Sequence, residues 1–412
     1  MDPQLTKDAL EYHKFPVAGK TQVVSTKPVA TQRDLSLAYS PGVAAPCIEI
    51  EQSPLTAYDY TNKGNLVAVI TNGTAVLGLG NIGALAGKPV MEGKGILFKK
   101  FAGIDVFDIE INETRVDEFV DIVAALEPTF GGINLEDIKA PECFAIEEKL
   151  KSRLKIPVFH DDQHGTAIVV AAGIINGLKI VEKSLDKVKI VVSGAGAAAI
   201  ACLNLLIQLG ARKELIFVCD SKGVIYEGRD GKLDPTKQLY VQKTEYRTLC
   251  DAMVDADIFL GVSGPSTVKP DMIRKMAKDP LVFALANPTP EIMPELVKDV
   301  RPDAIMATGR SDYPNQVNNA LCFPYIFRGA LDVGATCIND AMKIATIHAI
   351  ADLATQIPSE LVANSYGGQD IRFGRDYIIP RPLDPRLIKV IAPAVAKAAI
   401  ESGVATRPYA SL

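Results

Sequence analysis

A stretch of 21 residues without a charged side chain, from Val191 to Ala211, constrains the fold more than any other segment of the sequence. Its length would suffice for a membrane span, but Gly194, Gly196 and several polar residues interrupt it. It divides better into a strand (KIVVS), a glycine-rich turn and a buried helix (AAAIACLNLLIQLG), and a second apolar strand (ELIFVCD) follows. Strand, helix and strand in this order predict a βαβ unit with two parallel strands.

Further βα units follow this one. The apolar runs ADIFLGVSG, LVFALANP and AIMATG predict short strands, and helical patterns lie around 270–278 and 291–297. Alternating strands and helices predict an α/β fold with a Rossmann-type, doubly wound parallel sheet, a common scaffold for dinucleotides. The last part of the chain is helical at 337–355 and 385–402, and we expect it to pack back over the first half.

The first 160 residues are less regular. Pro28, Pro41, Pro46 and Pro54 exclude a long helix before residue 60. Short apolar runs (LVAVI, ILFKKF, VFDIEI and IPVF) then alternate with glycine-rich turns and with helical patterns at 115–126 and 141–154, and a largely buried helix at 165–182 joins the two halves. We therefore expect an N-terminal substrate and metal domain at 1–160, a dinucleotide-binding domain at 161–340 and a C-terminal helical segment at 341–412.

Charge and cysteine usage narrow the class of protein. The net charge is −5 and no basic stripe is visible, which argues against a nucleic-acid partner. The N-terminal residues contain no apolar segment typical of a signal peptide, and no stretch is favoured as a membrane span. The seven cysteines are widely spaced and form no CxxC motif, so we expect free thiols and a reducing, cytoplasmic location.

Two segments match the glycine fingerprint of a dinucleotide-binding turn. Gly78-Leu-Gly80-Asn-Ile-Gly83 fits the GxGxxG spacing in full, and Asp105 follows as a candidate ribose-binding acid. The fingerprint works only if a helix begins after it and points its free N–H groups at the pyrophosphate. The next residues, ALAGKPVMEGKG, contain three glycines and a proline, so we predict no helix there and regard this match as a decoy.

The second match has the right context, with a strand before it and a helix after it. The strand of ELIFVCD ends in an acid 24 residues beyond Gly196, where a carboxylate can bond a ribose hydroxyl. A tight turn without a ligand is the alternative. Basic side chains near that acid would pair with a 2′-phosphate, so we predict NADP, with NAD possible. The predicted cofactor-binding residues are Gly194, Ala195, Gly196, Ala197, Ala198, Asp220, Ser221, Lys222, Lys237 and Asn287.

Two pairs of acids are the best candidates for a metal site. Glu136-Asp137 lie in GGINLEDIK, and Asp161-Asp162 lie in PVFHDDQHGTA, between a predicted strand and the connecting helix. Solvated acids, or a simple helix cap by Asp162, are the alternatives. Together the pairs offer hard oxygen ligands without a thiolate cluster, which favours Mg²⁺ or Mn²⁺ over zinc. The flanking His160 and His164 are interpreted as core or helix-start histidines.

Two further residues are candidates for proton transfer. Lys94 lies between glycines in KPVMEGKGILF, before a predicted apolar strand, and a lysine beside a metal can approach neutrality and act as a base. Tyr39 lies in LAYSPG, before a Pro-Gly turn that can hold its phenol rigidly. A surface lysine and a core tyrosine are the alternatives.

These segments together resemble the malic enzyme family: AYSPGVA, VITNGTAVLGLGNIG, KPVMEGKG, GGINLEDI, FHDDQHGTA, SGAGAAA, ALANPTPE and QVNNALCFPYIFRG. The resemblance covers nearly the whole chain in order. It is strongest to the malic domain of bacterial hybrid malic enzymes, in which a phosphotransacetylase-like domain follows. The sequence ends at ATRPYASL, about where that domain would begin, so we expect either a short form or part of a longer protein.

The resemblance implies a role for each candidate. It makes Tyr39 the general acid and Lys94 the general base. The metal ligands would be Glu136, Asp137 and Asp162, with Asp161 behind them, and the residues contacting substrate or nicotinamide would be Asn287, Asn318 and Asn319. One departure matters: larger malic enzymes carry a substrate-binding arginine where this chain has Ala75, so the partner of the second substrate carboxylate is open.

The implied activity is the oxidative decarboxylation of malate to pyruvate and CO₂ with reduction of NADP and a divalent metal, in a homodimer or larger oligomer. Decarboxylation of oxaloacetate is a further expected activity. Two other interpretations remain: a metal-independent hydroxy-acid or amino-acid dehydrogenase in which Lys94 acts alone, and a non-catalytic dinucleotide-sensing module. Sensitivity to a chelator separates the first from a malic enzyme, and any turnover excludes the second.

Overall fold

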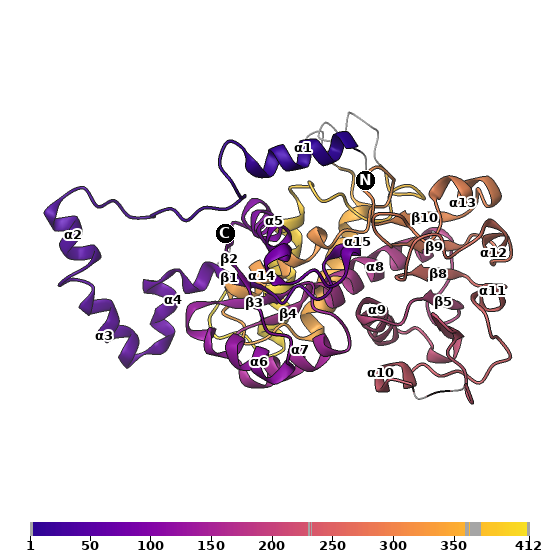
Figure 1. The fold of residues 1–412 in the computed structure, drawn as a ribbon, viewed down its shortest axis with the longest axis horizontal. Coiled ribbons are helices and arrows are strands. Elements are labelled where there is room, and N and C mark those ends of the chain that lie inside the picture. Colours follow the sequence, from indigo (N-terminus) through magenta and orange to yellow (C-terminus); the bar gives the residue numbers. More distant parts are fainter. Residues whose placement is uncertain (1–2, 230, 232, 359–361, 363–371, 410–412) are drawn as a thin grey trace.

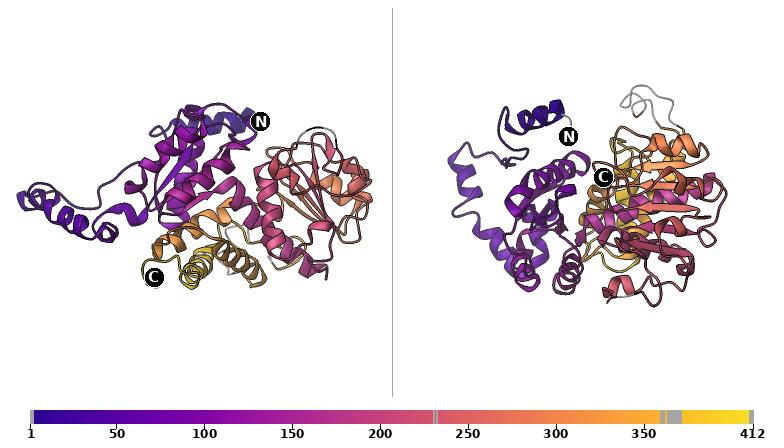
Figure 2. Two further views of the ribbon diagram at one scale, coloured as in Figure 1. Left: turned by 90° about the horizontal axis from the view of Figure 1, so that it is seen from below. Right: turned by 45° about the vertical axis from the view of Figure 1, so that its right-hand side comes forward.

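Two largely parallel β-sheets organise the molecule, one in each half of the chain. The computed structural model describes residues 3–229, 231, 233–358, 362 and 372–409. Figures 1 and 2 show the sheets in two lobes, with the C-terminal helices lying beside the N-terminal lobe. This is the predicted α/β class.

The N-terminal sheet has four parallel strands in the order β2-β1-β3-β4. The strands are β2 (Asp105–Glu110), β1 (Leu66–Thr71), β3 (Gly132–Leu135) and β4 (Val158–His160). Every residue of β1 is buried, as expected for a central strand covered on both faces. The predicted helices are confirmed as α6 (Val116–Ala125) and α7 (Glu142–Arg153), which pack against each other.

Helix α5 (Ala84–Ala102) contradicts the sequence prediction. The segment ALAGKPVMEGKG is helical, and ILFKKF continues the helix instead of forming a strand. The buried face of the helix is the reason: Met91 and Phe98 are fully buried, and α5 packs on β1 and β2 of the sheet and on α14. Burial of this face outweighs the low helix propensity of glycine and the bond lost at Pro89.

The second sheet has the order β10-β9-β8-β5-β6-β7, and only β7 is antiparallel. Its elements are β5 (Ile190–Ser193), α9 (Ala197–Gln208), β6 (Ile216–Asp220), β7 (Gly223–Val224), β8 (Ile258–Gly261), β9 (Leu281–Ala284) and β10 (Ile305–Thr308). The predicted βαβ unit and the doubly wound sheet are therefore confirmed. The chain moves from β5 to β6 on one side and returns to β8 on the other, which places the topological switch point between β5 and β8.

Helices connect and cover the sheets. The short ones beside the second sheet are α10 (Pro235–Gln238), α11 (Leu249–Ala252), α12 (Pro270–Arg274) and α13 (Pro294–Val300). The connecting helix α8 (Asp161–Ile180) is largely buried. The C-terminal helices are α14 (Phe323–Asp332), α15 (Asp340–Thr355) and α17 (Leu387–Glu401); α14 packs on α5 and α15 on α8, which confirms that they pack back over the first half.

The N-terminal helices are much more exposed. Helix α1 (Pro3–Lys14) is followed by α2 (Gln32–Ala38), α3 (Ala44–Gln52) and α4 (Ala57–Tyr60), and none of these four helices contains a buried residue. Figure 1 shows α2 and α3 projecting away from the two lobes. We name residues 31–60 the N-terminal arm.

Two expectations about the cellular environment concern the whole chain. Across the part of the chain that is described, no helix has both the length and the apolar character needed to cross a bilayer. All seven cysteines are free thiols, and four of them are buried: Cys143, Cys202, Cys219 and Cys322.

Candidate functional site

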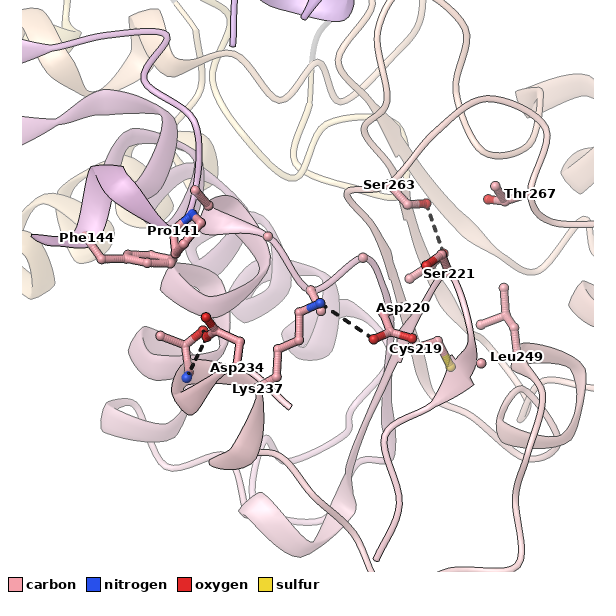
Figure 3. A pocket seen from close by; sticks show the side chains of 17 residues that line it. Pro141, Phe144, Cys219, Asp220, Ser221, Asp234, Lys237, Leu249, Ser263 and Thr267 are labelled. Carbon is pink, nitrogen blue, oxygen red and sulfur yellow. Dashed lines mark hydrogen bonds and ion pairs between the residues drawn. The ribbon is translucent and has the colours of Figure 1, made fainter. Parts of the chain in front are cut away.

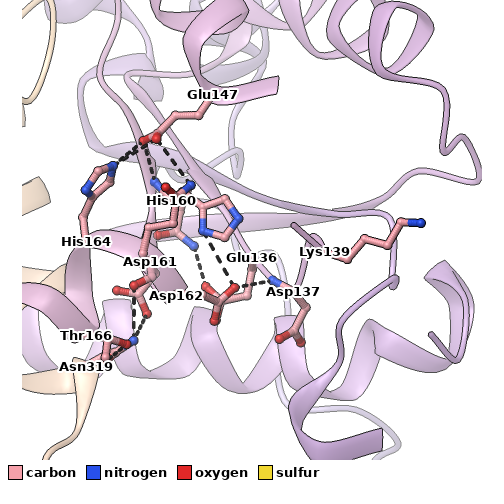
Figure 4. Close-up of polar contacts among 12 residues, drawn as sticks. Glu136, Asp137, Lys139, Glu147, His160, Asp161, Asp162, His164, Thr166 and Asn319 are labelled. Carbon is pink, nitrogen blue, oxygen red and sulfur yellow. Dashed lines mark hydrogen bonds and ion pairs between the residues drawn. The ribbon is translucent and has the colours of Figure 1, made fainter. Parts of the chain in front are cut away.

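Three carboxylates converge at the carboxyl edge of the N-terminal sheet. Glu136 and Asp137 follow β3, and Asp162 lies in the first turn of α8, directly after β4. Because β3 and β4 are neighbouring parallel strands, their carboxyl ends meet at one edge, although 25 residues separate Asp137 from Asp162. One oxygen atom from each of Glu136, Asp137 and Asp162 lies within 4.8 Å of the others (Figure 4). The sequence prediction that these residues come together is therefore correct.

The backbone and nearby polar groups hold these carboxylates in place. Asp137 has a φ of 55°, in the left-handed region that is unfavourable for a residue with a side chain. Its backbone N–H donates to Asp162 Oδ2 at 2.9 Å, and the amide of Asn134 donates to Glu136 Oε2 at 2.9 Å. Asp137 Oδ2 is buried without a hydrogen-bond partner. A buried carboxylate oxygen without a donor fits a hard divalent cation.

The electrostatics of the cluster also favour a bound cation. Burial, only partly offset by Lys94, raises the pKa of Glu136 to about 8. Burial and the charge of Glu136 together raise the pKa of Asp137 to about 7. Carboxylates held this close repel one another, and a bound cation would reduce that repulsion.

Lys94 lies on α5 and points into the same cluster. Its Nζ donates to Asp161 Oδ2 at 2.6 Å, forms an ion pair with Glu136 Oε1 at 2.9 Å, and lies 4.2 Å from the ring centre of Phe323. Burial disfavours the ammonium form, but the charges of Asp161 and Glu136 outweigh it and raise the pKa of Lys94 above its usual range. With these carboxylates alone Lys94 is charged, so the neutrality expected of a base requires further positive charge nearby.

Asp161 holds Lys94 in place and does not join the group of three. It is fully buried, and its Oδ2 also accepts a hydrogen bond from Asn319 Nδ2 at 3.0 Å. Thr166 donates its hydroxyl to Asn319 Oδ1 at 3.2 Å. An added Cβ at Gly165 would overlap Asp161 Oδ1, so glycine is required there. This places Asp161 behind the three carboxylates, as the resemblance implied.

A cavity of about 600 Å³, which we name the acidic pocket, is lined by Lys94 and by the three carboxylates Glu136, Asp137 and Asp162. Ala75, Asn287, Asn318 and Asn319 also line it, and Lys94 is its one basic side chain among the lining residues of the described structure. The side chain of Asn287 packs directly on Gly309, where an added Cβ would lie 2.7 Å from Asn287 Nδ2. The pocket therefore combines hard ligands, one cation and several amides.

Tyr39 does not reach the acidic pocket of its own chain. It caps the carboxyl end of α2 on the N-terminal arm and is 71% exposed. It is not among the residues that line the pocket. One chain alone therefore does not bring the two predicted proton-transfer residues, Tyr39 and Lys94, together.

A second cavity, of about 680 Å³, lies at the switch point of the six-stranded sheet (Figure 3). Gly194, Ala195 and Gly196 line it between β5 and α9. Gly194 has a φ of 116°, and an added Cβ there would lie 2.5 Å from Val262 O, so only glycine fits. We name this cavity the dinucleotide pocket. Ser263 lines both pockets, which makes them neighbours.

The first glycine match lies elsewhere. Gly78 lines the acidic pocket and not the dinucleotide pocket, although helix α5 does follow Gly83. The reason given for rejecting this match was therefore wrong, because the helix exists.

Among the other predicted cofactor residues, Asn287 and Ala198 line the acidic pocket, and Ala197 and Lys222 line neither cavity.

Asp220 ends β6 at the rim of the dinucleotide pocket, but its carboxylate is already paired. The guanidinium of Arg229 donates to Asp220 Oδ1 at 2.9 Å and to Oδ2 at 2.8 Å, and Lys237 Nζ lies 3.6 Å from Oδ2. Burial opposes ionisation, yet Arg229 outweighs it and lowers the pKa of Asp220. The sequence reasoning missed Arg229, whose only signal was a basic residue in the glycine-containing loop after β7.

The two flanking histidines contact Glu147 beside the three carboxylates (Figure 4): the backbone N–H of His160 donates to Glu147 Oε1 at 3.2 Å, and His160 Nδ1 lies 3.8 Å from Asp162 Oδ2. His164 Nε2 lies 2.8 Å from Glu147 Oε1, and Lys151 pairs with the same oxygen at 2.7 Å. His160 is fully buried, and neither histidine belongs to the group of three carboxylates. This agrees with the interpretation of both as core or helix-start histidines.

Comparison with known proteins adds an independent line of argument. The family described as "Malic enzyme, N-terminal domain" matches residues 18–115 and 112–151, and "Malic enzyme, NAD binding domain" matches residues 163–362. An NADP-dependent malic enzyme of Escherichia coli is 69% identical over 411 residues, which cover 100% of this chain and 54% of that protein. An NAD-dependent malic enzyme of Rhizobium meliloti is 61% identical over 98% of this chain and 52% of its own length.

The fold agrees with a solved relative. The crystal structure of malic enzyme from Pyrococcus horikoshii superimposes with a TM-score of 0.89 at 46% identity, covering 98% of this chain and 92% of that one. The chain spans about half the length of the two curated relatives described above.

Proposed function

The chain belongs to the malic enzyme family, and from this premise we propose that it oxidises and decarboxylates malate to pyruvate and CO₂, with NADP as oxidant and Mg²⁺ or Mn²⁺ as cofactor. The observation that carries the proposal is the convergence of three carboxylates and Lys94 in a pocket beside the dinucleotide pocket. In a metal-independent dehydrogenase, the three converging acids and the unpaired buried oxygen of Asp137 would have no binding partner.

In this mechanism Lys94 removes the proton from the C2 hydroxyl of malate while hydride passes from C2 to NADP, and the resulting oxaloacetate loses its C4 carboxylate as CO₂ to leave the enolate of pyruvate. Glu136, Asp137 and Asp162 would hold a divalent cation, which would supply Lewis-acid stabilisation of negative charge on the substrate oxygens and the positive charge that favours a neutral Lys94. Asp161 keeps the Lys94 ammonium group at a fixed position through its 2.6 Å hydrogen bond. Decarboxylation of oxaloacetate needs the same groups without the oxidation step.

Amide side chains are proposed to orient the substrate. Asn318 uses its Oδ1 to accept from the backbone N–H of Ala320 at 2.9 Å, which leaves its amide nitrogen for the pocket. Asn287 and Asn319 line the same cavity. Because Ala75 brings no cation, neutral amides or a residue of a second copy must hold the second carboxylate of malate.

NADP is proposed because basic side chains already pair with Asp220 at the dinucleotide pocket. An acid that selects NAD must offer free carboxylate oxygens to the ribose hydroxyls. Here Arg229 engages both oxygens of Asp220, and Lys237 lies beside them. Ser221 lines the cavity and offers a hydroxyl. A 2′-phosphate fits this arrangement better than a 2′-hydroxyl does.

We further propose a homodimer in which each copy lends its N-terminal arm to the other. The arm exposes Leu35, Leu37, Tyr39 and Ile48 by 46% to 71%, an apolar surface that a soluble monomer rarely presents. The loop beside the acidic pocket, together with the first turn of α5, exposes a second apolar set: Leu77, Leu79 and Leu85, which are 68%, 68% and 83% exposed. An arm from a second copy that covers this loop buries both surfaces.

The same arrangement supplies the missing acid. Tyr39 lies within the apolar surface of the arm, so an arm docked on the partner's loop brings the phenol to the partner's pocket. There it protonates the enolate of pyruvate, while Lys94 of the receiving copy serves as the base.

The free thiols are consistent with a cytoplasmic location, which we propose as well. Since the curated relatives are longer, a phosphotransacetylase-like domain in the whole protein remains part of the proposal.

The test is an assay with L-malate, Mn²⁺ and either NADP or NAD, following reduced cofactor and pyruvate together. We expect equal amounts of both products, a preference for NADP, and complete loss of turnover with excess chelator that added Mn²⁺ restores. Turnover that ignores the chelator would establish a metal-independent dehydrogenase. Dinucleotide binding without any turnover would establish a sensor.

A further inference from the structure

A buried glutamate, Glu291, joins the loops that follow β8 and β9 in the six-stranded sheet. It is fully buried in the loop between β9 and α13. Its Oε1 accepts a hydrogen bond from the backbone N–H of Ser263, after β8, at 2.8 Å. Its Oε2 accepts one from the backbone N–H of Ala286, after β9, at 3.0 Å. One carboxylate thus spans two loops.

The connection continues to the loop after β5. The hydroxyl of Ser263 also donates to Glu291 Oε1 at 3.3 Å, and it lies 2.9 Å from the hydroxyl of Ser193, the last residue of β5. Space is reserved for the carboxylate, because an added Cβ at Gly261 would lie 2.5 Å from Glu291 Cδ. Glu291 has no lysine, arginine or histidine within ion-pair distance among the described residues, so backbone N–H groups and one hydroxyl satisfy it.

These loops lie where the nicotinamide half of the cofactor must be. Arg229 and Lys237 mark the adenosine half on the β6 side of the switch point, so the other half crosses β5 toward β8 and β9. The joined loops carry Ser263, which lines both pockets, and Asn287, which lines the acidic pocket and follows Ala286 directly. The loops therefore form the wall between nicotinamide and substrate.

We infer that Glu291 is a positioning residue for hydride transfer: by holding the loops of Ser263 and Asn287 together it fixes the nicotinamide against the substrate, without touching either. The inference rests on the proposed function. A charged acceptor shared by two loop N–H groups gives strong and directional bonds, and loss of one acceptor lets one loop move. Movement by even about 1 Å lowers the rate of a reaction between two bound molecules.

The experiment compares Glu291→Gln with Asp384→Asn. Glutamine keeps the shape but turns an N–H donor toward one of the two loop N–H groups. Asp384 is a matched control, because it is equally buried and its Oδ2 pairs with Arg386 at 2.7 Å beside α17, away from both pockets. Each variant is assayed for kcat and KM of malate, for the affinity of NADPH from its own fluorescence, and for the affinity of 2′,5′-ADP, which carries only the adenosine half.

For Glu291→Gln we expect kcat for malate oxidation to fall roughly ten- to a hundredfold and NADPH affinity to fall, with 2′,5′-ADP affinity unchanged. Asp384→Asn should lower the Tm and leave all three readouts unchanged. If the affinity for 2′,5′-ADP falls in parallel with kcat, Glu291 only holds the domain together. If kcat and the affinity for NADPH are both unchanged, Glu291 positions nothing. Either result overturns the inference. The NADPH titration needs no turnover, so an inactive wild-type protein would contradict the proposed function and leave this comparison intact.

Discussion

If the N-terminal arm completes the partner's pocket, two inactive variants must restore each other. We consider Tyr39→Phe, which removes the phenol hydroxyl from the arm, and Lys94→Ala, which removes the base from the pocket. Each homodimer lacks one proton-transfer group at both sites, and we expect each to lose about a hundredfold to ten-thousandfold in kcat. Both changes leave the predicted contacts of the arm in place, because the Tyr39→Phe change keeps an aromatic ring at this exposed position.

The size of the recovery follows from two-fold symmetry. In a heterodimer of the two variants, the pocket with an intact Lys94 receives the intact Tyr39 of the other chain, and the second pocket receives both defects. One of the two sites is therefore complete, so the heterodimer should have about half of the wild-type activity per dimer. If Tyr39 served its own chain, each site would lack one group and no activity would return.

The assay uses co-expression of two chains with different affinity tags, tandem purification of the heterodimer, and malate-dependent formation of NADPH. The control carries Tyr39→Phe and Lys94→Ala on one chain, paired with a wild-type chain. Exchange of arms predicts that this heterodimer is inactive, because each pocket receives one defect, whereas an arm that served its own chain predicts about half activity. Recovery in the control but not in the first heterodimer would refute the exchange of arms.

Three further predictions follow from the two pockets. Asp137→Asn and Asp162→Asn should each reduce Mn²⁺-dependent turnover more than about a hundredfold while circular dichroism stays unchanged, since both supply oxygens to the same group of three; full activity in either variant would remove that residue from the metal site. Arg229→Ala and Lys237→Gln should each weaken NADP by roughly ten- to a hundredfold and NAD much less, measured as kcat/KM for each cofactor, and a wild-type preference for NAD would contradict the argument. Gly165→Ala should lower the free energy of unfolding by about 1–3 kcal/mol and reduce kcat, because the new methyl group must displace Asp161 from Lys94. An unchanged urea midpoint and an unchanged kcat would show that α8 accommodates the methyl group without moving Asp161.

Local sequence pattern was enough to predict the parts of the fold that depend on neighbouring residues. The βαβ unit around Val191 to Ala211 was predicted because an uncharged strand and helix with a glycine turn between them have few other ways to bury their side chains. The convergence of Glu136, Asp137 and Asp162 was expected from the resemblance to the malic enzyme family. The structure explains it, because residues that directly follow the neighbouring parallel strands β3 and β4 meet at one edge of the sheet.

Features that depend on contacts between distant residues could be seen only in the tertiary structure. Helix α5 forms against the local propensity of its glycines because its buried face, with Met91 and Phe98, packs on the sheet and on α14. Arg229 pairs with Asp220 across a loop, so the acid predicted to bind ribose is already paired with a cation. The exposure of Tyr39 could not be predicted from the sequence either. The Pro-Gly turn that follows it does not indicate whether its own chain or another chain packs on the tyrosine side chain. Local periodicity fixes which residues are apolar or helical, but the free energy of packing between segments decides which of them come together.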